Sequence, residues 1–308
     1  MSLDFTTFDV FTTIPFRGNP LAIVHVPSNI QLAQNQKQLI AREFNLSETV
    51  FLHEQTPADI KARIARIDIF TALAEVPFAG HPTVGTANYL LHHLHLDSAH
   101  VLSTKAGPLP FKEITFPPNS EAGAQISVAH NMHIHSTPFA GTPYSHFPVV
   151  SIVNGMSMIL ARQPDLAALA AQTGNLVGIE NTYGASAKLD EGWRNGPVLS
   201  YFYVDLGVTG GVRKLRTRTL SSREDPATGS AASALTAYLT LSEGKEGSLV
   251  RKYEITQGVE MGRRSVIRVQ VTLNEARDGI REVLLSGSAV RVLEGKVPIP
   301  DVGLAVYE

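Results

Sequence analysis

The stretch "SREDPATGSAASAL", residues 222–235, places carboxylates, a tight turn and a hydroxyl group before an alanine-rich run that is typical of a helix. Proline fits the first turn of a helix because its missing N–H would have no partner there. Glycine lets a ligand approach the backbone, and the free N–H groups of a first turn attract an anion. We therefore expect Thr228, Gly229 and Ser230 to bind an anionic group beside Asp225. The alternative is an ordinary helix that Asp225 caps.

The stretch "GHPTVGTANYLL", residues 80–91, has the same features: His81 stands before a proline, and Gly85 and Thr86 follow. With an offset of 144 residues the two stretches align without gaps, and His81 falls on Asp225. Matching spacing and chemistry predict a duplicated chain with one central helix in each half. Chance similarity between two stretches rich in alanine and glycine is the alternative.

The two acid–base candidates of these stretches differ in chemistry. His81 is suited to moving a proton near neutral pH, or it is a histidine hydrogen-bonded inside the turn. Asp225, kept ionised by the helix dipole, would orient a substrate group rather than transfer a proton. Two such helix starts, facing each other across a domain cleft, would hold a small carboxylate between them.

Short strands mixed with a few helices must position these residues. Alternating or apolar runs predict strands at 22–26, 49–54, 59–64, 266–273 and 283–295. The helices after Pro82 and Pro226 are apolar on most sides, which indicates burial, for instance within a wrapped sheet. We therefore predict an α+β fold with two similar domains, 1–125 and 126–308, each a mostly antiparallel sheet around a central helix. The final strand can pack back on the first domain.

The composition excludes several classes of function. The chain of 308 residues contains no cysteine, so disulfides, thiolate metal sites and thiol nucleophiles are absent. A net charge of −2 without a basic block argues against nucleic acid as a partner. No apolar run has the length of a membrane span, and the N-terminal residues do not resemble a signal peptide. We expect a cytoplasmic protein that does not bind membranes.

Histidines cluster at 92–95 and at 130–135, and Trp193 is the single tryptophan. His92 and His95, three residues apart on a predicted helix, could bind a metal, but no third ligand is evident nearby. We therefore expect a polar surface and a loop at these clusters, and no metal site. Trp193 could line the cleft, contact a partner chain or lie on a surface loop.

Four stretches and the opening "FDVFTTIPFRGNPLAIV" (8–24) together resemble the PhzF family, the phenazine-biosynthesis-type isomerases. They are "NLSETVF" (45–51), "FTALAEVPFAGHPTVGTA" (70–87), "REDPATGSAASAL" (223–235) and "QGVEMGRRSVIRVQV" (257–271). The resemblance covers nearly the whole chain. It implies a diaminopimelate-epimerase-like fold with the active site between two domains, and a homodimer. The epimerases of this fold use two cysteines, which this chain lacks.

The resemblance also implies roles for individual residues. Glu48, otherwise a loop carboxylate, matches the glutamate that moves the proton while a dihydro-hydroxyanthranilate is isomerised. We expect a closed apolar site to raise the pKa of its carboxyl, so that it works near pH 7. His81 and Asp225 would assist as catalytic residues, and no cofactor is needed. The residues assigned to substrate binding are Ser47, Gly80, Gly85, Thr86, Thr228, Gly229 and Ser230.

Two functions follow from these expectations. The first is a cofactor-free isomerase of a small carboxylated, cyclic metabolite, which moves a proton between carbons. The second is a non-catalytic protein that binds a small carboxylate in the same cleft. Glu48 separates them, because a binding protein gains nothing from a carboxylate that repels its ligand. The combination of Glu48, His81 and Asp225 favours the enzyme.

Overall fold

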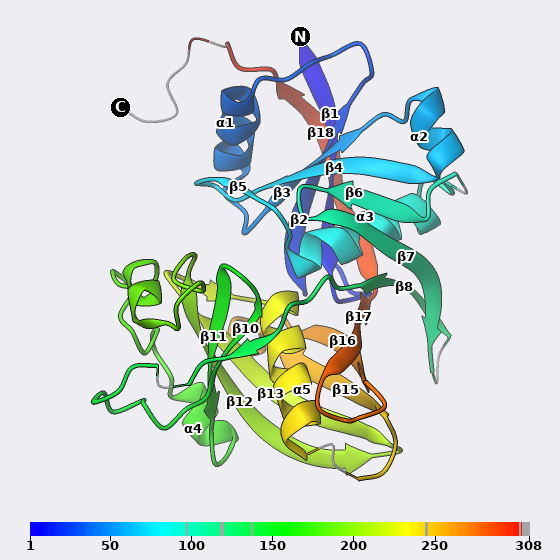
Figure 1. Cartoon of the computed structure of the whole chain (residues 1–308). Helices are drawn as coiled ribbons and strands as arrows, with labels where there is room; N and C mark the ends of the chain where they lie inside the picture. The colour runs from blue at the N-terminus through cyan, green and yellow to red at the C-terminus, as the bar shows by residue number, and fades with distance from the viewer. Residues whose placement is uncertain (97, 118–119, 137, 244–245, 302, 304–308) are drawn as a thin grey trace. The chain divides into compact units, whose positions relative to one another are not determined.

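The computed structural model describes residues 1–96, 98–117, 120–136, 138–243, 246–301 and 303 (Figure 1). The chain forms two compact units. Unit 1 comprises residues 1–127 and 286–308, and unit 2 comprises residues 128–285. Among the described residues, no helix is long and apolar enough to cross a membrane.

The described residues of unit 1 form three helices and a sheet. Its elements are β1 (Ser2–Val10), β2 (Asn19–Val26), α1 (Gln34–Phe44), β3 (Thr49–His53), α2 (Pro57–Ala62), β4 (Ile64–Phe70), β5 (Glu75–Val76), α3 (Gly80–His92), β6 (Val101–Thr104), β7 (Gly107–Phe116), β8 (Glu121–Ser127) and β18 (Ala289–Pro298). The last strand, β18, pairs antiparallel with β1 along nearly its whole length, from Ser2↔Pro298 to Val10↔Ala289. Strand β18 is therefore built into the sheet of unit 1.

Unit 2 has the same kinds of element. They are β9 (His133–Ile134), β10 (Val149–Val153), β11 (Met156–Arg162), α4 (Leu166–Ala170), a 3-10 turn η1 (Gly184–Lys188), β12 (Val198–Thr209), β13 (Val212–Leu220), β14 (Glu224–Asp225), α5 (Gly229–Glu243), β15 (Val250–Gln257), β16 (Ser265–Leu273) and β17 (Ile280–Gly287). Strand β17 continues from unit 2 into unit 1, whose remaining residues begin at Ser286.

The strand pairings of the two units follow one pattern. In unit 1 the pairs β1–β2, β3–β4 and β6–β7 are antiparallel, whereas β2–β3 and β4–β6 are parallel. In unit 2 the pairs β10–β11, β12–β13 and β15–β16 are antiparallel, whereas β11–β12 and β13–β15 are parallel. Each unit is thus a mostly antiparallel sheet with the same topology. This confirms the predicted α+β fold with two similar halves.

One helix lies inside the curve of each sheet (Figure 1). Helix α3 packs against β1, β2, β7, β8 and β18, and α5 packs against β10, β11, β15 and β16. Every residue of α3 from Gly80 to Leu90 is buried, and α5 is buried from Gly229 to Ala237. The small and apolar side chains around both helices allow this close packing on all sides. The predicted burial of both helices is confirmed.

The expected register of the internal repeat is wrong. Glu75 on β5 pairs with the last residue of β4, and Glu224 on β14 pairs with the last residue of β13. A proline and a short connection then lead to the first residue of the central helix, Gly80 or Gly229. The structural repeat therefore aligns "EVPFAG" with "EDPATG" at an offset of 149 residues. His81 corresponds to Ser230, not to the strand residue Asp225.

The strand expected at 59–64 is also wrong. Residues 57–62 form helix α2, and β4 begins only at Ile64. Thr56 caps this helix, because its hydroxyl accepts the N–H of Asp59 while the Asp59 carboxylate accepts the N–H of Thr56. This capping box, with Pro57 in the first turn, outweighs the alternating pattern that favoured a strand.

Candidate functional site

The end of helix α1 sets the position of Glu48. The helix ends at Phe44, and Asn45 takes the left-handed conformation with a φ of 48° while its N–H donates to the carbonyl of Ala41. Asparagine tolerates this conformation better than most residues, so it terminates the helix and redirects the chain. Glu48 then directly precedes β3, whose first residue is fully inside the sheet between β2 and β4.

His81 is the second residue of α3 and faces Glu48. Its Nδ1 atom lies 3.2 Å from Glu48 Oε2, and the two side chains are 4% and 19% exposed. Burial lowers the pKa of the His81 imidazole to about 3, although a hydrogen bond to the backbone of Pro20 acts in the opposite direction. Pro20 lies near the start of β2, so the starts of β2, β3 and α3 meet at this point. The imidazole is neutral at pH 7.

A neutral imidazole suits a carboxyl group that changes its protonation state. In a neutral imidazole one ring nitrogen donates a hydrogen bond and the other accepts one, and the tautomer decides which is which. At the observed separation, Nδ1 of His81 can donate to ionised Glu48 or accept a proton from protonated Glu48. The pair therefore has the chemistry of a proton-transfer centre in which one histidine serves both forms of one acid.

The first turn of α3 leaves backbone donors open. The N-cap residue, Ala79, offers no side chain to the N–H groups of this turn. In a helix that begins at Gly80 with Ala79 as its N-cap, the N–H groups of Gly80 and His81 have no acceptor within the helix, and Pro82 has no N–H. Such a helix start attracts an anion through these groups and through the helix dipole.

Gly85 and Thr86 lie one turn further inside α3 than expected. A Cβ atom at Gly85 would stand 2.5 Å from Leu21 Cδ2 and 2.7 Å from Val10 Cγ2, so the glycine lets the helix approach β1 and β2. Thr86 is fully buried, and its Oγ1 has no hydrogen-bond partner among the described residues. Packing of the helix on the sheet, rather than approach of a ligand, explains the absence of a side chain at Gly85.

The start of α5 differs from that of α3 because the residue before the helix has a hydroxyl group. Thr228 precedes the first helical residue, Gly229, and its carbonyl accepts the N–H of Ala232 at 2.9 Å. The N–H groups of Gly229, Ser230 and Ala231 thus have no acceptor within the helix. Ser230 is 4% exposed. Because α5 begins at Gly229, Thr228 holds the capping position that the sequence allowed for Asp225.

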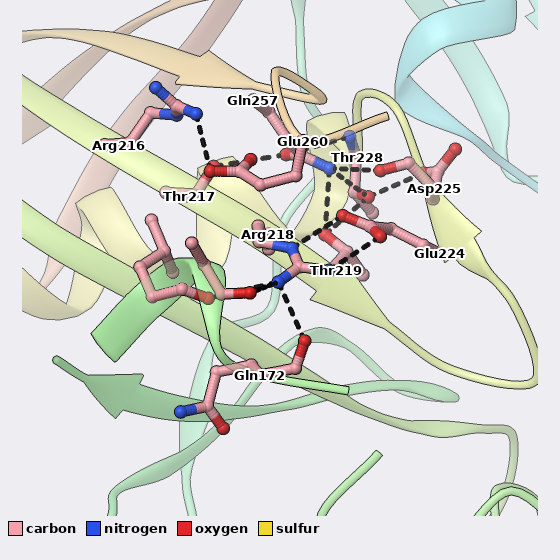
Figure 2. Close-up of polar contacts among 12 residues, drawn as sticks. Gln172, Arg216, Thr217, Arg218, Thr219, Glu224, Asp225, Thr228, Gln257 and Glu260 are labelled. Atoms are coloured by element: carbon pink, nitrogen blue, oxygen red, sulfur yellow. Dashed lines mark hydrogen bonds and ion pairs between the residues drawn. The ribbon is translucent and has the colours of Figure 1, made fainter. Parts of the chain in front are cut away.

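A buried polar network holds Asp225 in place (Figure 2). Thr228 Oγ1 donates to Asp225 Oδ2 at 2.6 Å and lies 2.7 Å from Thr219 Oγ1. Gln257 Nε2 donates to the Asp225 carbonyl at 2.8 Å and to both threonine hydroxyl groups at 3.0 and 3.1 Å. A network in which every member is bonded keeps a carboxylate in one orientation.

Gln257 joins this network to the body of unit 2. It is completely buried, and its Oε1 accepts from Tyr201, from Thr217 and from the backbone N–H of Thr228, each at 3.3 Å. The sequence argument missed this residue, although "QGVEMG" was one of the stretches that carried the family resemblance. The signal was the amide side chain that begins this stretch, but the strand that Gln257 ends, β15, was not predicted.

Glu224, the neighbour of Asp225, is fixed by Arg218 (Figure 2). The guanidinium group donates to both carboxylate oxygens of Glu224, at 2.8 and 2.9 Å. Its Nη1 donates to the carbonyls of Leu169, Ala170 and Gln172 at the end of α4. The Glu224 carboxylate also raises the pKa of Arg218. Arg218 thus ties β14, and with it Asp225, to α4 and β13.

The structure assembles the predicted site residues in two groups. Glu48 and His81 are in contact in unit 1, where Ser47 precedes Glu48 and Gly80 precedes His81. Asp225, Thr228, Gly229 and Ser230 lie together in unit 2, between β14 and the first turn of α5. His92 and His95 do not share a helix face, because α3 ends at His92 and His95 has a φ of 49°.

Comparison with solved structures shows the fold. The crystal structure of a PhzF-family phenazine biosynthesis protein from Bacillus anthracis superimposes with a TM-score of 0.76 at 23% identity, covering 97% of this chain and 100% of that one. A probable proline racemase from Agrobacterium radiobacter K84 gives a TM-score of 0.61 at 13% identity, covering 98% and 94%. The fold is therefore the epimerase-like fold that the sequence predicted.

Sequence comparison shows the family. The model of the phenazine biosynthesis-like proteins, PhzC-PhzF, matches residues 8–295. An uncharacterized isomerase of Mesorhizobium japonicum is 32% identical, covering 96% of this chain and 98% of that protein. The trans-2,3-dihydro-3-hydroxyanthranilate isomerase of Pseudomonas chlororaphis is 31% identical, covering 95% and 98%. The chain belongs to the phenazine biosynthesis-like PhzC-PhzF family of isomerases.

Proposed function

We propose that the protein isomerises a small carboxylated, cyclic metabolite by moving a proton between two carbons, with Glu48 as base and then as acid. The ionised Glu48 carboxylate removes a proton from carbon, and the electron pair of the broken C–H bond enters the conjugated system. Protonated Glu48 then returns a proton to another carbon of that system. Atoms and electrons balance without an oxidant, a reductant or a cofactor.

The contact between Glu48 and His81 carries this proposal. The Nδ1–Oε2 distance of 3.2 Å lets a neutral imidazole partner the carboxyl before and after proton transfer. A cationic imidazole would hold Glu48 ionised and make it a weak base, but burial keeps the pKa of His81 far below neutral. A fixed, neutral partner can therefore serve both the ionised and the protonated form of the carboxyl.

The helix starts support a carboxylate as part of the substrate. The first turn of α3 presents backbone N–H groups that no capping side chain covers. In unit 2, the first turn of α5 presents those of Gly229 and Ser230, with Asp225 oriented beside it by Thr228. We assign substrate binding to these groups and substrate orientation to Asp225. Ser47 and Thr86 remain predictions as binding residues.

The relative from Pseudomonas chlororaphis suggests the first substrate to try, trans-2,3-dihydro-3-hydroxyanthranilate. We would incubate it in heavy water with the protein and with Glu48→Gln, and follow the ring protons by NMR. The expected result is isomerisation by the wild type and a loss of at least about 100-fold in Glu48→Gln, because a positioned acid–base group contributes that much or more. Equal rates in both proteins would overturn the role of Glu48.

The same experiment separates the enzyme from the alternative, a non-catalytic protein that binds a small carboxylate. If neither protein turns the compound over but calorimetry shows that both bind it, the binding protein is favoured. If the wild type neither binds nor converts it, the substrate is another carboxylate. The predicted homodimer and cytoplasmic location are tested by light scattering after size exclusion and by cell fractionation.

A further inference from the structure

Two histidines and an aspartate converge in unit 2, away from the residues assigned above. His133 lies on β9, His135 follows that strand, and Asp190 follows the turn η1. His133 Nε2 is 2.9 Å and His135 Nδ1 is 3.9 Å from Asp190 Oδ2, and all three ligand atoms lie within 4.8 Å of one another. A loop was expected at these histidines, and spacing alone did not connect them to Asp190, which is 55 positions from His135.

Hydrogen bonds fix the orientation of the Asp190 carboxylate. The backbone N–H of Ser136 donates to Oδ2 at 3.0 Å, and the Ser136 hydroxyl donates to Oδ1 at 3.1 Å. The Asp190 carboxylate accepts these bonds together with that of His133. The carboxylate is therefore held towards the two imidazole rings.

The tautomer of His135 is also fixed. Its Nδ1 accepts a long hydrogen bond from the backbone N–H of Asp190, with an N–N distance of 3.3 Å. Nδ1 therefore carries a lone pair on the side of Asp190. The opposite nitrogen, Nε2, then carries the ring proton and donates to Ser151 Oγ at 2.9 Å, which in turn lies 2.7 Å from Ser157 Oγ. A histidine that binds a metal usually donates its second ring N–H in this way.

We propose that His133, His135 and Asp190 form a binding site for one divalent transition-metal cation, Zn²⁺ in the first place. Two imidazoles and one carboxylate are the donor set that Zn²⁺ takes with three protein ligands and a water molecule. The cation would replace the proton shared by His133 and Asp190. It would also displace the long hydrogen bond from the Asp190 N–H to His135 Nδ1, because that lone pair would then bind the metal. The three ligand atoms would move to the separations of a tetrahedral site. The side chains of His133 and Asp190 are 32% and 25% exposed, which leaves a path from solvent.

Trp193 gives this site an optical reporter. Its ring stacks on His133 with centroids 4.7 Å apart and an interplanar angle of 9°, and it meets His135 edge-on at 6.3 Å. Trp193 is the single tryptophan of the chain, so the indole emission comes from this place alone. A paramagnetic ion bound by His133 would lie close to the ring and quench that emission.

The test begins with the full chain freed of metal by dialysis against a chelator. Zn²⁺ is titrated by calorimetry, and Co²⁺ is titrated while the tryptophan emission is followed. We expect one Zn²⁺ per chain and quenching by Co²⁺ that Zn²⁺ reverses. Asp190→Asn and His133→Gln should each weaken Zn²⁺ binding by at least about tenfold, since one of three ligands is lost. Zn²⁺ should also raise the melting temperature of the wild type.

The matched control is His146→Gln, which removes an exposed histidine of the same unit outside the cluster. It should bind Zn²⁺ as the wild type does. Equal affinity of Asp190→Asn, His133→Gln and the wild type would overturn the proposal and point to adventitious surface histidines. Absence of Zn²⁺ binding at 1:1 in a wild type that gives a cooperative melt would also overturn it, and would leave a simple histidine–aspartate pair.

Discussion

The Nδ1 atom of His81 lies 3.2 Å from Glu48 Oε2, although the two residues come from different elements, the start of helix α3 and the loop before β3. Burial makes the imidazole neutral, so the contact joins an acid to a group that can both donate and accept. This relationship leads to predictions about rate and about stability.

For the rate, His81→Gln should lower kcat by roughly 100-fold and leave KM nearly unchanged, because the side chain partners Glu48 while the backbone N–H groups stay in place. If the two residues act as one unit, the double variant Glu48→Gln/His81→Gln should be no slower than Glu48→Gln alone. Steady-state kinetics on the identified substrate measure all three variants. Fully multiplicative losses would show that the two residues act independently.

For stability, the direction follows from the pKa of His81, which is about 3 in the folded chain and about 6.5 in the unfolded chain. Between these values the unfolded chain binds one proton more than the folded chain. The free energy of unfolding should therefore fall as the pH falls from about 6.5 towards 3, by on the order of a few kcal/mol, and be independent of His81 above that range.

Urea unfolding at pH 7, 5.5 and 4 measures this dependence. In His81→Gln the loss of stability between pH 7 and 4 should be smaller than in the wild type, because one titrating group is gone. Other histidines contribute in both proteins, so the difference between the two curves is the quantity of interest. Parallel curves would mean that the imidazole is already protonated in the folded chain or that it is exposed.

The central helices were predictable because their small and apolar residues cover all sides, a pattern that favours a buried helix whatever surrounds it. The offset of the repeat was not predictable. The sequence aligns the prolines of "HP" and "DP", yet Pro82 lies inside α3 whereas Pro226 lies before α5. Where a helix begins depends on the hairpin before it, and the pairing of Glu75 and Glu224 with the preceding strands fixes that point.

The site was predictable only in part. The helix starts indicated anion binding, but spacing alone left Glu48 a loop carboxylate, and only the resemblance to a family assigned it a role. Gln257 could not be found in this way, because its partners Thr219 and Thr228 are brought to it by the pairing of β13 with β15 and by the start of α5. The packing role of Gly85 likewise depends on two strands far from it in the chain.

The bond from Thr228 to Asp225 is expected to serve both stability and activity. Thr228→Val keeps the shape of the side chain but removes the donor to Asp225 and an acceptor of Gln257. The loss of these hydrogen bonds from the network should cost about 1–3 kcal/mol of unfolding free energy. It should also raise KM, since one of the bonds that orient Asp225 is lost. Thr228→Ser keeps the hydroxyl and is the control. A valine variant as stable and active as the serine variant would contradict the prediction.

Gly85 is expected to be required for packing rather than for binding. In Gly85→Ala the new Cβ would stand 2.5 Å from Leu21 Cδ2 and 2.7 Å from Val10 Cγ2, far inside contact distance, so α3 or the two strands must move. Overpacking of this kind costs about 1–3 kcal/mol, which urea unfolding measures. Leu21→Val removes the Cδ2 atom, so the alanine substitution should cost less in that background than in the wild type. If Gly85→Ala were as stable as the wild type but bound substrate weakly, the glycine would serve the ligand after all. If Gly85→Ala lowered the free energy of unfolding equally in the wild type and in Leu21→Val, the strain would not arise at Leu21.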